Sequence, residues 1–155
     1  MNFIQSVKTC FQKYANFKGR ATRSEFWWFQ LFFWLVLFGV IFVLWLSGYD
    51  ITDEFLDVIL IGEIFLFIPV LSVTSRRLHD LGLTGWVQAP VVLTYLENLD
   101  IFIDGFSEIS LVQNINNVAF FFFALILVIC AFPGRVGKNK YGSDPKAPNL
   151  DEVFN

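Results

Sequence analysis

The sequence is poor in the residues from which metal sites and disulfide frameworks are built. It contains one histidine and two cysteines, and the cysteines lie far apart in the chain. Structural zinc sites need several cysteine and histidine ligands, and disulfide-stabilised domains need several cysteine pairs. We therefore expect Cys10 and Cys130 to be free thiols, and we expect neither a metal nor a cofactor.

Charge is also scarce. Only 16% of the residues are charged and the net charge is −3, so the composition gives no indication of a nucleic-acid partner. The first 25 residues carry five lysines and arginines, but they lack the apolar block followed by small residues that a cleavable signal peptide requires. We expect the N-terminal segment to be retained.

Apolar and aromatic side chains, by contrast, are abundant. They make up 55% and 19% of the chain, and 20 residues are phenylalanine. The core of a soluble domain of this size is too small for so many rings, whereas lipid accepts apolar side chains on every face of a helix. The composition predicts an all-α integral membrane protein.

Four segments are candidates for transmembrane helices, namely residues 26–47, 55–74, 86–103 and 111–132. The first is almost uninterruptedly apolar, and at about 1.5 Å per residue it is long enough to cross a hydrocarbon core of about 30 Å. The second has the right length but contains two carboxylates and a proline, and the last two have less certain limits. These spans predict one membrane domain over residues 1–132 and a short irregular cytoplasmic tail over residues 133–155.

Basic residues predict the orientation, because the cytoplasmic flanks of membrane helices are enriched in lysine and arginine. With four spans and both termini in the cytoplasm, all 11 basic residues fall on the cytoplasmic side. The segments on the opposite side contain acidic but no basic residues. Three spans would place a basic cluster outside, so the pattern favours four.

Two local patterns precede the first span. Residues 3–17 carry apolar side chains at helical spacing with polar residues between them. This pattern fits an amphipathic helix lying on the inner leaflet, and it fits equally well a short helix packed on the ends of the spans. Thr22 with Glu25 three residues later is the pattern of a capping box at the start of the first span.

Three motifs together resemble a known family. They are "FKGRATRSEFWWFQL" (17–31), "SRRLHDLGLTGW" (75–86) and "FPGRVGKNKYGSDP" (132–145), and in this order they resemble the bacterial inner-membrane family called domain of unknown function 805. The matching positions are Gly19, Arg20, Arg23, Glu25, Trp27, Arg76, Arg77, His79, Asp80, Gly85, Trp86, Gly134, Asn139, Tyr141, Gly142 and Pro145. The resemblance implies a small multi-pass protein of the inner (plasma) membrane, with no established activity.

All three motifs fall on the cytoplasmic side of the predicted arrangement. Their polar residues are predicted to converge there as a candidate anion-binding or lipid-binding face, formed by Arg20, Arg23, Arg76, Arg77, His79, Asp80, Asn139 and Tyr141. Arginine forks suit phosphate and carboxylate groups, and basic pockets at this depth bind anionic lipid head groups. The alternative is structural: Arg76 and Arg77 determine topology, while Asp80 and Glu25 pair with arginines and tie helix ends together.

A catalytic role is disfavoured. His79 and Asp80 are adjacent, and adjacent residues on a helix do not face each other. The segment "GRVGKNKYG" (134–142) fails as a phosphate-binding loop, because Phe132 and Asn139 stand where glycine and serine or threonine are required. We expect no enzyme.

Glu63 lies well inside the second predicted span, where an ionisable group is costly unless it is protonated or paired. It is the candidate for an intramembrane proton or cation relay in a small oligomeric transporter or channel. A hydrogen bond to Asn116 or Asn117 is the structural alternative. The leading hypothesis is instead a non-enzymatic module whose cytoplasmic Arg/His/Asp face contacts anionic lipid or a partner protein, with a second copy of the chain as a further possible partner.

Overall fold

The computed structural model of the chain describes residues 1–48, 53–92 and 110–147. Its elements are α1 (Phe3–Gln12), α2 (Arg23–Ser47), α3 (Asp53–Asp80), the short 3-10 helix η1 (Gly85–Gln88) and α5 (Ser110–Ala131). No strand occurs within these residues, so the all-helical prediction is confirmed for them.

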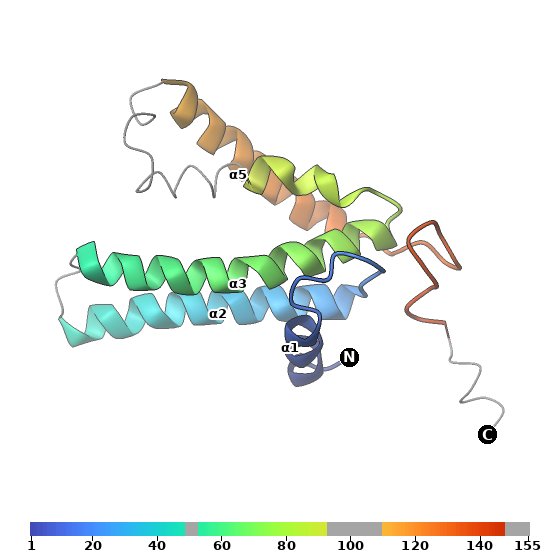
Figure 1. Cartoon of the computed structure of the whole chain (residues 1–155), viewed down its shortest axis with the longest axis horizontal. Helices are drawn as coiled ribbons and strands as arrows, with labels where there is room; N and C mark the ends of the chain where they lie inside the picture. Colours follow the sequence, from blue (N-terminus) through green and yellow to red (C-terminus); the bar gives the residue numbers. More distant parts are fainter. Residues whose placement is uncertain (49–52, 93–109, 148–155) are drawn as a thin grey trace.

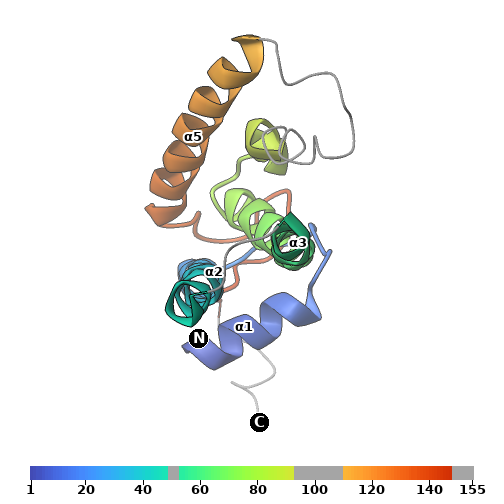
Figure 2. The same ribbon diagram turned by 90° about the vertical axis from the view of Figure 1, so that its left-hand side faces the viewer.

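The helices diverge from one end of the molecule. Helices α2 and α3 lie side by side and antiparallel, whereas α1 lies across them near the start of α2 (Figures 1 and 2). Helix α5 approaches the other helices where α3 ends and leads away from them towards its own N-terminal end (Figure 1). The end of α3 is therefore the place where distant parts of the sequence meet.

Helix α2 contains the first predicted span and is the one described helix long and apolar enough to cross a membrane. Only 17% of its most apolar stretch is buried, so most of its side chains face outward. The second predicted span lies within α3, which continues to Asp80, and the fourth coincides with α5 apart from its last residue. Most of the third span lies outside the described residues, so the four-span count stays a prediction.

The start of α2 corrects one detail of the sequence analysis. Thr22 caps the helix, because its hydroxyl oxygen accepts a hydrogen bond from the backbone N–H of Glu25 at 3.2 Å. The Glu25 carboxylate does not return to the cap, however. It is buried and pairs with Arg76 at 2.5 Å, because an inward-facing carboxylate gains more from a buried cation than from one amide.

Helix α1 is shorter than the predicted 3–17 and ends at Gln12. Beyond it, tertiary hydrogen bonds replace helical ones: the Lys13 carbonyl accepts from the Ser72 hydroxyl at 3.0 Å, and the Tyr14 hydroxyl donates to the Phe65 carbonyl at 2.6 Å. These bonds attach the end of α1 to α3.

The apolar face of α1 packs on α2. This agrees with the interpretation of residues 3–17 as a short helix packed on the ends of the spans. Ring centroids lie 5.8 Å apart for Phe3 and Trp28 and 5.7 Å apart for Phe11 and Phe29. Ile4 remains 75% exposed on the outer face of α1. The helix is thus both packed and able to present apolar surface.

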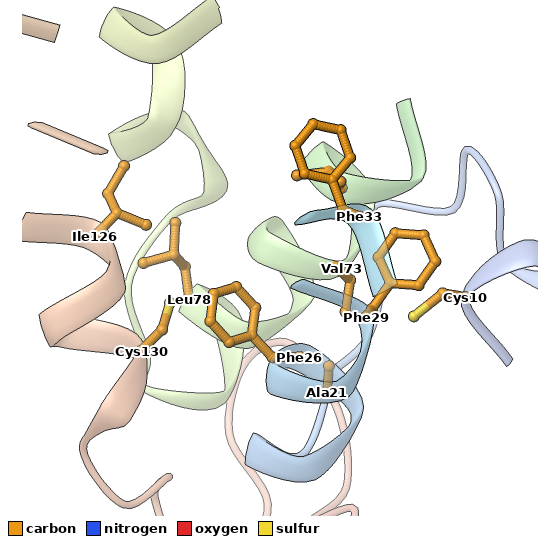
Figure 3. Close-up of a cluster of buried hydrophobic side chains, with 10 residues drawn as sticks. Cys10, Ala21, Phe26, Phe29, Phe33, Val73, Leu78, Ile126 and Cys130 are labelled. Atoms are coloured by element: carbon orange, nitrogen blue, oxygen red, sulfur yellow. The ribbon is translucent and has the colours of Figure 1, made fainter. Parts of the chain in front are cut away.

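The core lies where α2, α3 and α5 meet. Leu78 of α3 is completely buried, and Figure 3 shows it between Phe26 of α2 and the pair Ile126 and Cys130 of α5. Cys10 of α1 belongs to the same cluster. Both cysteines are buried free thiols, which confirms the expectation from the sequence.

Replacing Leu78 by alanine leaves a cavity that three helices border, so we expect Leu78→Ala to lower the free energy of unfolding by about 2–5 kcal/mol. Leu35→Ala is the matched control, because Leu35 is 58% exposed on α2 and its loss opens no internal cavity. Unfolding of both variants in detergent micelles checks this. Equal losses would contradict the position of Leu78 in the core.

Candidate functional site

The three sequence motifs come together at one end of the molecule. We call this the basic end; it comprises residues 1–23, 75–85 and 132–147 (Figure 1). Three of its arginines are buried, with exposed fractions of 7% for Arg20, 1% for Arg76 and 0% for Arg77. Buried charges are stable only when they are paired and hydrogen-bonded, so the partners of these arginines determine what the basic end can do.

Asp80 is the shared partner of two of them. Its carboxylate accepts from Arg20 Nε at 2.8 Å and from Arg77 Nη1. Arg77 also donates to the carbonyl of Cys130 in the last turn of α5, at 3.1 Å, and to the carbonyl of Phe132, the residue that follows α5. The two arginines and Asp80 thus join the loop before α2, the end of α3 and the end of α5.

Glu25 and Arg76 form a second buried pair that joins α2 to α3. The thiol of Cys10 lies beside the Glu25 carboxylate, with the sulfur 4.0 Å from Oε1. Burial, reinforced by the negative charge of Glu25, raises the pKa of Cys10 to about 12. The thiol therefore stays protonated and unreactive at neutral pH.

The last carbonyls of α3 also find partners in distant segments. The carbonyls of Arg76, His79 and Asp80 accept from Ala21 N at 3.0 Å, from Asn139 Nδ2 at 2.9 Å and from Arg135 N at 2.9 Å, respectively. Helix C-terminal carbonyls lack intrahelical donors, so buried ends need such partners. Residues 132–147 are irregular, as predicted, but they pack against the end of α3 and cap its last carbonyls.

His79 faces different neighbours from Asp80. Its ring stacks on that of Tyr141 with a centroid distance of 3.8 Å and an angle of 7°, and its Nδ1 lies 3.1 Å from the Gly19 carbonyl oxygen. Burial lowers the pKa of His79 below its ordinary value, and Lys140, which lies over the Tyr141 ring, acts in the same direction.

Two glycines of the motifs permit this close packing. A Cβ on Gly134 would lie 1.8 Å from Asp80 Oδ2, and a Cβ on Gly85 would lie 2.0 Å from Ser75 Oγ. No side chain fits at either distance, so the motifs require glycine where the backbone approaches α3.

The structure thus places all eight predicted site residues in the basic end, and seven of them make contacts with distant segments there. Arg23 also belongs to the basic end, but it differs from the other seven because it is exposed on the surface and has no ion-pair or side-chain hydrogen-bond partner among the described residues. The side chains of Glu63, Asn116 and Asn117 lie outside the described part of the chain, so the relay stays a prediction.

Among the polar residues that sequence reasoning missed are Ser75 and Gln88, which line a hollow of about 590 Å³ beside His79. Ser75 opens the second motif but carries no charge to single it out. Gln88 stands in a largely apolar stretch that predicts a span. No signal in the sequence distinguishes either residue.

A family described as "Protein of unknown function (DUF805)" matches residues 14–143. This range includes the first two motifs completely and all but the last two residues of the third. The chain belongs to the DUF805 family. The resemblance inferred from the motifs is therefore confirmed, and in this DUF805 protein the motif residues build the basic end.

Relatives with known location agree with the composition. Inner membrane protein YhaI of Escherichia coli (strain K12) is 27% identical over 143 residues, covering 92% of this chain and 97% of YhaI. Inner membrane protein YhaH of the same strain is 26% identical over 144 residues, covering 87% and 91%. No solved structure matches this DUF805 chain. These relatives support a location in the bacterial inner membrane.

Removing the charge of Asp80 leaves two buried guanidinium groups without their carboxylate, so we expect Asp80→Asn to lower the free energy of unfolding by about 3–5 kcal/mol. Asp144→Asn is the matched control. Among the described residues, the Asp144 carboxylate accepts hydrogen bonds only from the backbone amides of Gly137 and Lys146, and asparagine keeps an acceptor oxygen there. Thermal unfolding in micelles gives both values, and a similar loss in both variants would contradict the shared pairing.

The lowered pKa of His79 predicts a dependence on pH. As the pH falls through about 6.5, the unfolded chain binds a proton at this residue before the native state does, so protonation favours unfolding and stability is lost below that pH. We expect the unfolding midpoint to fall further between pH 7.5 and pH 5.5 in the wild type than in His79→Phe, which keeps a ring against Tyr141 but cannot titrate. If the unfolding midpoint falls by the same amount in both proteins, His79 is not held neutral in the native state.

Proposed function

We propose that the protein is a non-enzymatic module of the inner membrane whose basic end lies in the cytoplasm and binds anionic lipid head groups. In this orientation the chain crosses the membrane several times with both termini inside. The proposal follows the distribution of basic residues, because cytoplasmic flanks of membrane helices carry most lysines and arginines.

The observation that carries the proposal is a division of the basic residues into two groups. The three buried arginines are enclosed, and the charge of each is paired with the carboxylate of Glu25 or Asp80. The other eight are exposed, and none of them forms an ion pair with a described residue; they are Lys8, Lys13, Lys18, Arg23, Arg135, Lys138, Lys140 and Lys146. The unpaired positive charge thus lies on the surface of the basic end.

This arrangement changes which residues contact the lipid. The buried arginines hold the helix ends in place, and the exposed lysines and arginines around them supply the attraction. Each basic residue near an anionic membrane surface contributes about 1 kcal/mol. Helix α1 adds to this, because it lies across α2 with Lys8 and the exposed Ile4 on its surface, as an interfacial helix would.

The test replaces three exposed lysines from separate segments, Lys8, Lys18 and Lys138, by glutamine. The matched control replaces the same three by arginine, which keeps the charge. In phosphatidylcholine nanodiscs containing phosphatidylglycerol, we expect the glutamine variant to bind phosphatidylglycerol about 100-fold more weakly, because three contacts of about 1 kcal/mol are lost. Native mass spectrometry of the released protein measures the retained lipid.

The arginine variant is expected to behave as the wild type, and added salt is expected to weaken retention in both. Equal retention of phosphatidylglycerol by the wild type and the glutamine variant would contradict the proposal. It would direct attention to a protein partner for the same surface.

A further inference from the structure

The hollow beside η1 has the composition of a ligand site. Its volume of about 590 Å³ is within the usual range for small-molecule pockets. Its walls are mostly apolar, with Phe17, Leu71 and Trp86 among them, and its polar residues are Ser75, His79, Thr84 and Gln88. It lies apart from the ion pairs of Asp80 and Glu25, and its chemistry differs from theirs.

Gln88 contributes an unsatisfied acceptor. The residue is only 8% exposed, and its Nε2 donates to the Leu71 carbonyl at 3.2 Å. A carbonyl can only accept, so this bond fixes which end of the amide is nitrogen. The opposite atom, Oε1, is buried and has no hydrogen-bond donor in the described structure. A buried acceptor left without a donor is costly, so this position favours a ligand that donates.

His79 contributes a second acceptor. The Gly19 carbonyl also can only accept, so His79 Nδ1 carries the proton, and in the neutral ring Nε2 keeps its lone pair. Nε2 lies towards η1, 3.6 Å from the position that a Cβ on Gly85 would occupy. The neighbouring Ser75 hydroxyl can accept as well as donate.

These groups define the charge of the ligand. Two lone-pair acceptors repel an anion, and the nearby Lys140 disfavours a cation, so a neutral group with a hydrogen-bond donor fits best. Leu71 and Val92 of the wall fall inside predicted spans, whereas Phe17 and His79 fall beyond them. The hollow therefore crosses the predicted boundary between lipid and head groups.

We propose that this hollow binds the hydroxyl-bearing end of a neutral single-chain membrane amphiphile of the monoacylglycerol class. The two hydroxyls of such a ligand donate one to Gln88 Oε1 and the other to His79 Nε2, and the acyl chain lies along the apolar wall towards the bilayer. This site is separate from the exposed lysines, and its ligand is uncharged. The binding of anionic lipid by the lysines and the binding of a neutral amphiphile in the hollow can therefore be disproved independently.

The test uses a monoacylglycerol with a photoreactive diazirine in its acyl chain, in nanodiscs of phosphatidylcholine, which has no hydroxyl donor. We expect cross-links within residues 71–92. We expect 1-monooleoylglycerol to compete at least 10-fold better than methyl oleate, which has the same chain but no donor. Equal competition by the two would overturn the proposal and would indicate lipid binding by the apolar wall alone.

Gln88→Met removes the buried acceptor, and Gln30→Met is its matched control. Gln30 is also buried, with both side-chain polar atoms unpartnered in the described structure, but it does not line the hollow. We expect Gln88→Met to abolish the preference for monooleoylglycerol and Gln30→Met to retain it.

His79→Phe provides a second variant in case Gln88→Met does not fold. It removes the Nε2 acceptor, keeps the ring against Tyr141, and is expected to reduce the same preference. Wild-type selectivity in a folded Gln88→Met or His79→Phe protein would overturn the proposal.

Discussion

The structure depends on one buried carboxylate that is shared by two arginines. Asp80 neutralises Arg20 and Arg77, and these arginines in turn satisfy backbone carbonyls at the end of α5 and in the segment that follows it. In a site of low dielectric, each of these groups would be strongly unfavourable alone. The loop before α2, the end of α3 and the end of α5 must therefore assemble together, which explains why the helices meet at this end and diverge from it.

The same constraint separates the basic residues by role. An arginine that is enclosed and paired with a buried carboxylate is out of reach of a lipid phosphate, whereas a lysine on the surface has a hydrated charge that an anionic membrane can attract. The buried arginines and Asp80 of the motifs thus form the frame of the basic end. The exposed lysines and arginines, most of which also lie within the motifs, form its contact surface. Glycine at Gly85 and Gly134 belongs to the frame, because the backbone approaches α3 too closely there for any side chain.

His79 shows how the frame also creates chemistry at its edge. Tyr141 covers one face of its ring and the Gly19 carbonyl holds its Nδ1, so the remaining nitrogen is an acceptor towards the hollow. A lone histidine in the sequence invites a catalytic or metal-binding interpretation. Its surroundings hold the ring in place and favour its neutral form, so that Nε2 can accept a hydrogen bond.

The sequence by itself determined the helical class, the apolar α2, the cap at Thr22, the free thiols and the family, because composition, periodicity and local motifs carry that information. It also brought the right residues to one end, since basic residues mark the flanks of the spans. Only the tertiary structure decided that Glu25 pairs with Arg76 instead of closing a capping box and that α1 ends at Gln12. It also decided that Gln88 Oε1 is buried without a hydrogen-bond donor among the described residues. Each of these depends on a partner far away in the chain, and the position of such a partner follows from the packing of helices, which local sequence patterns do not encode.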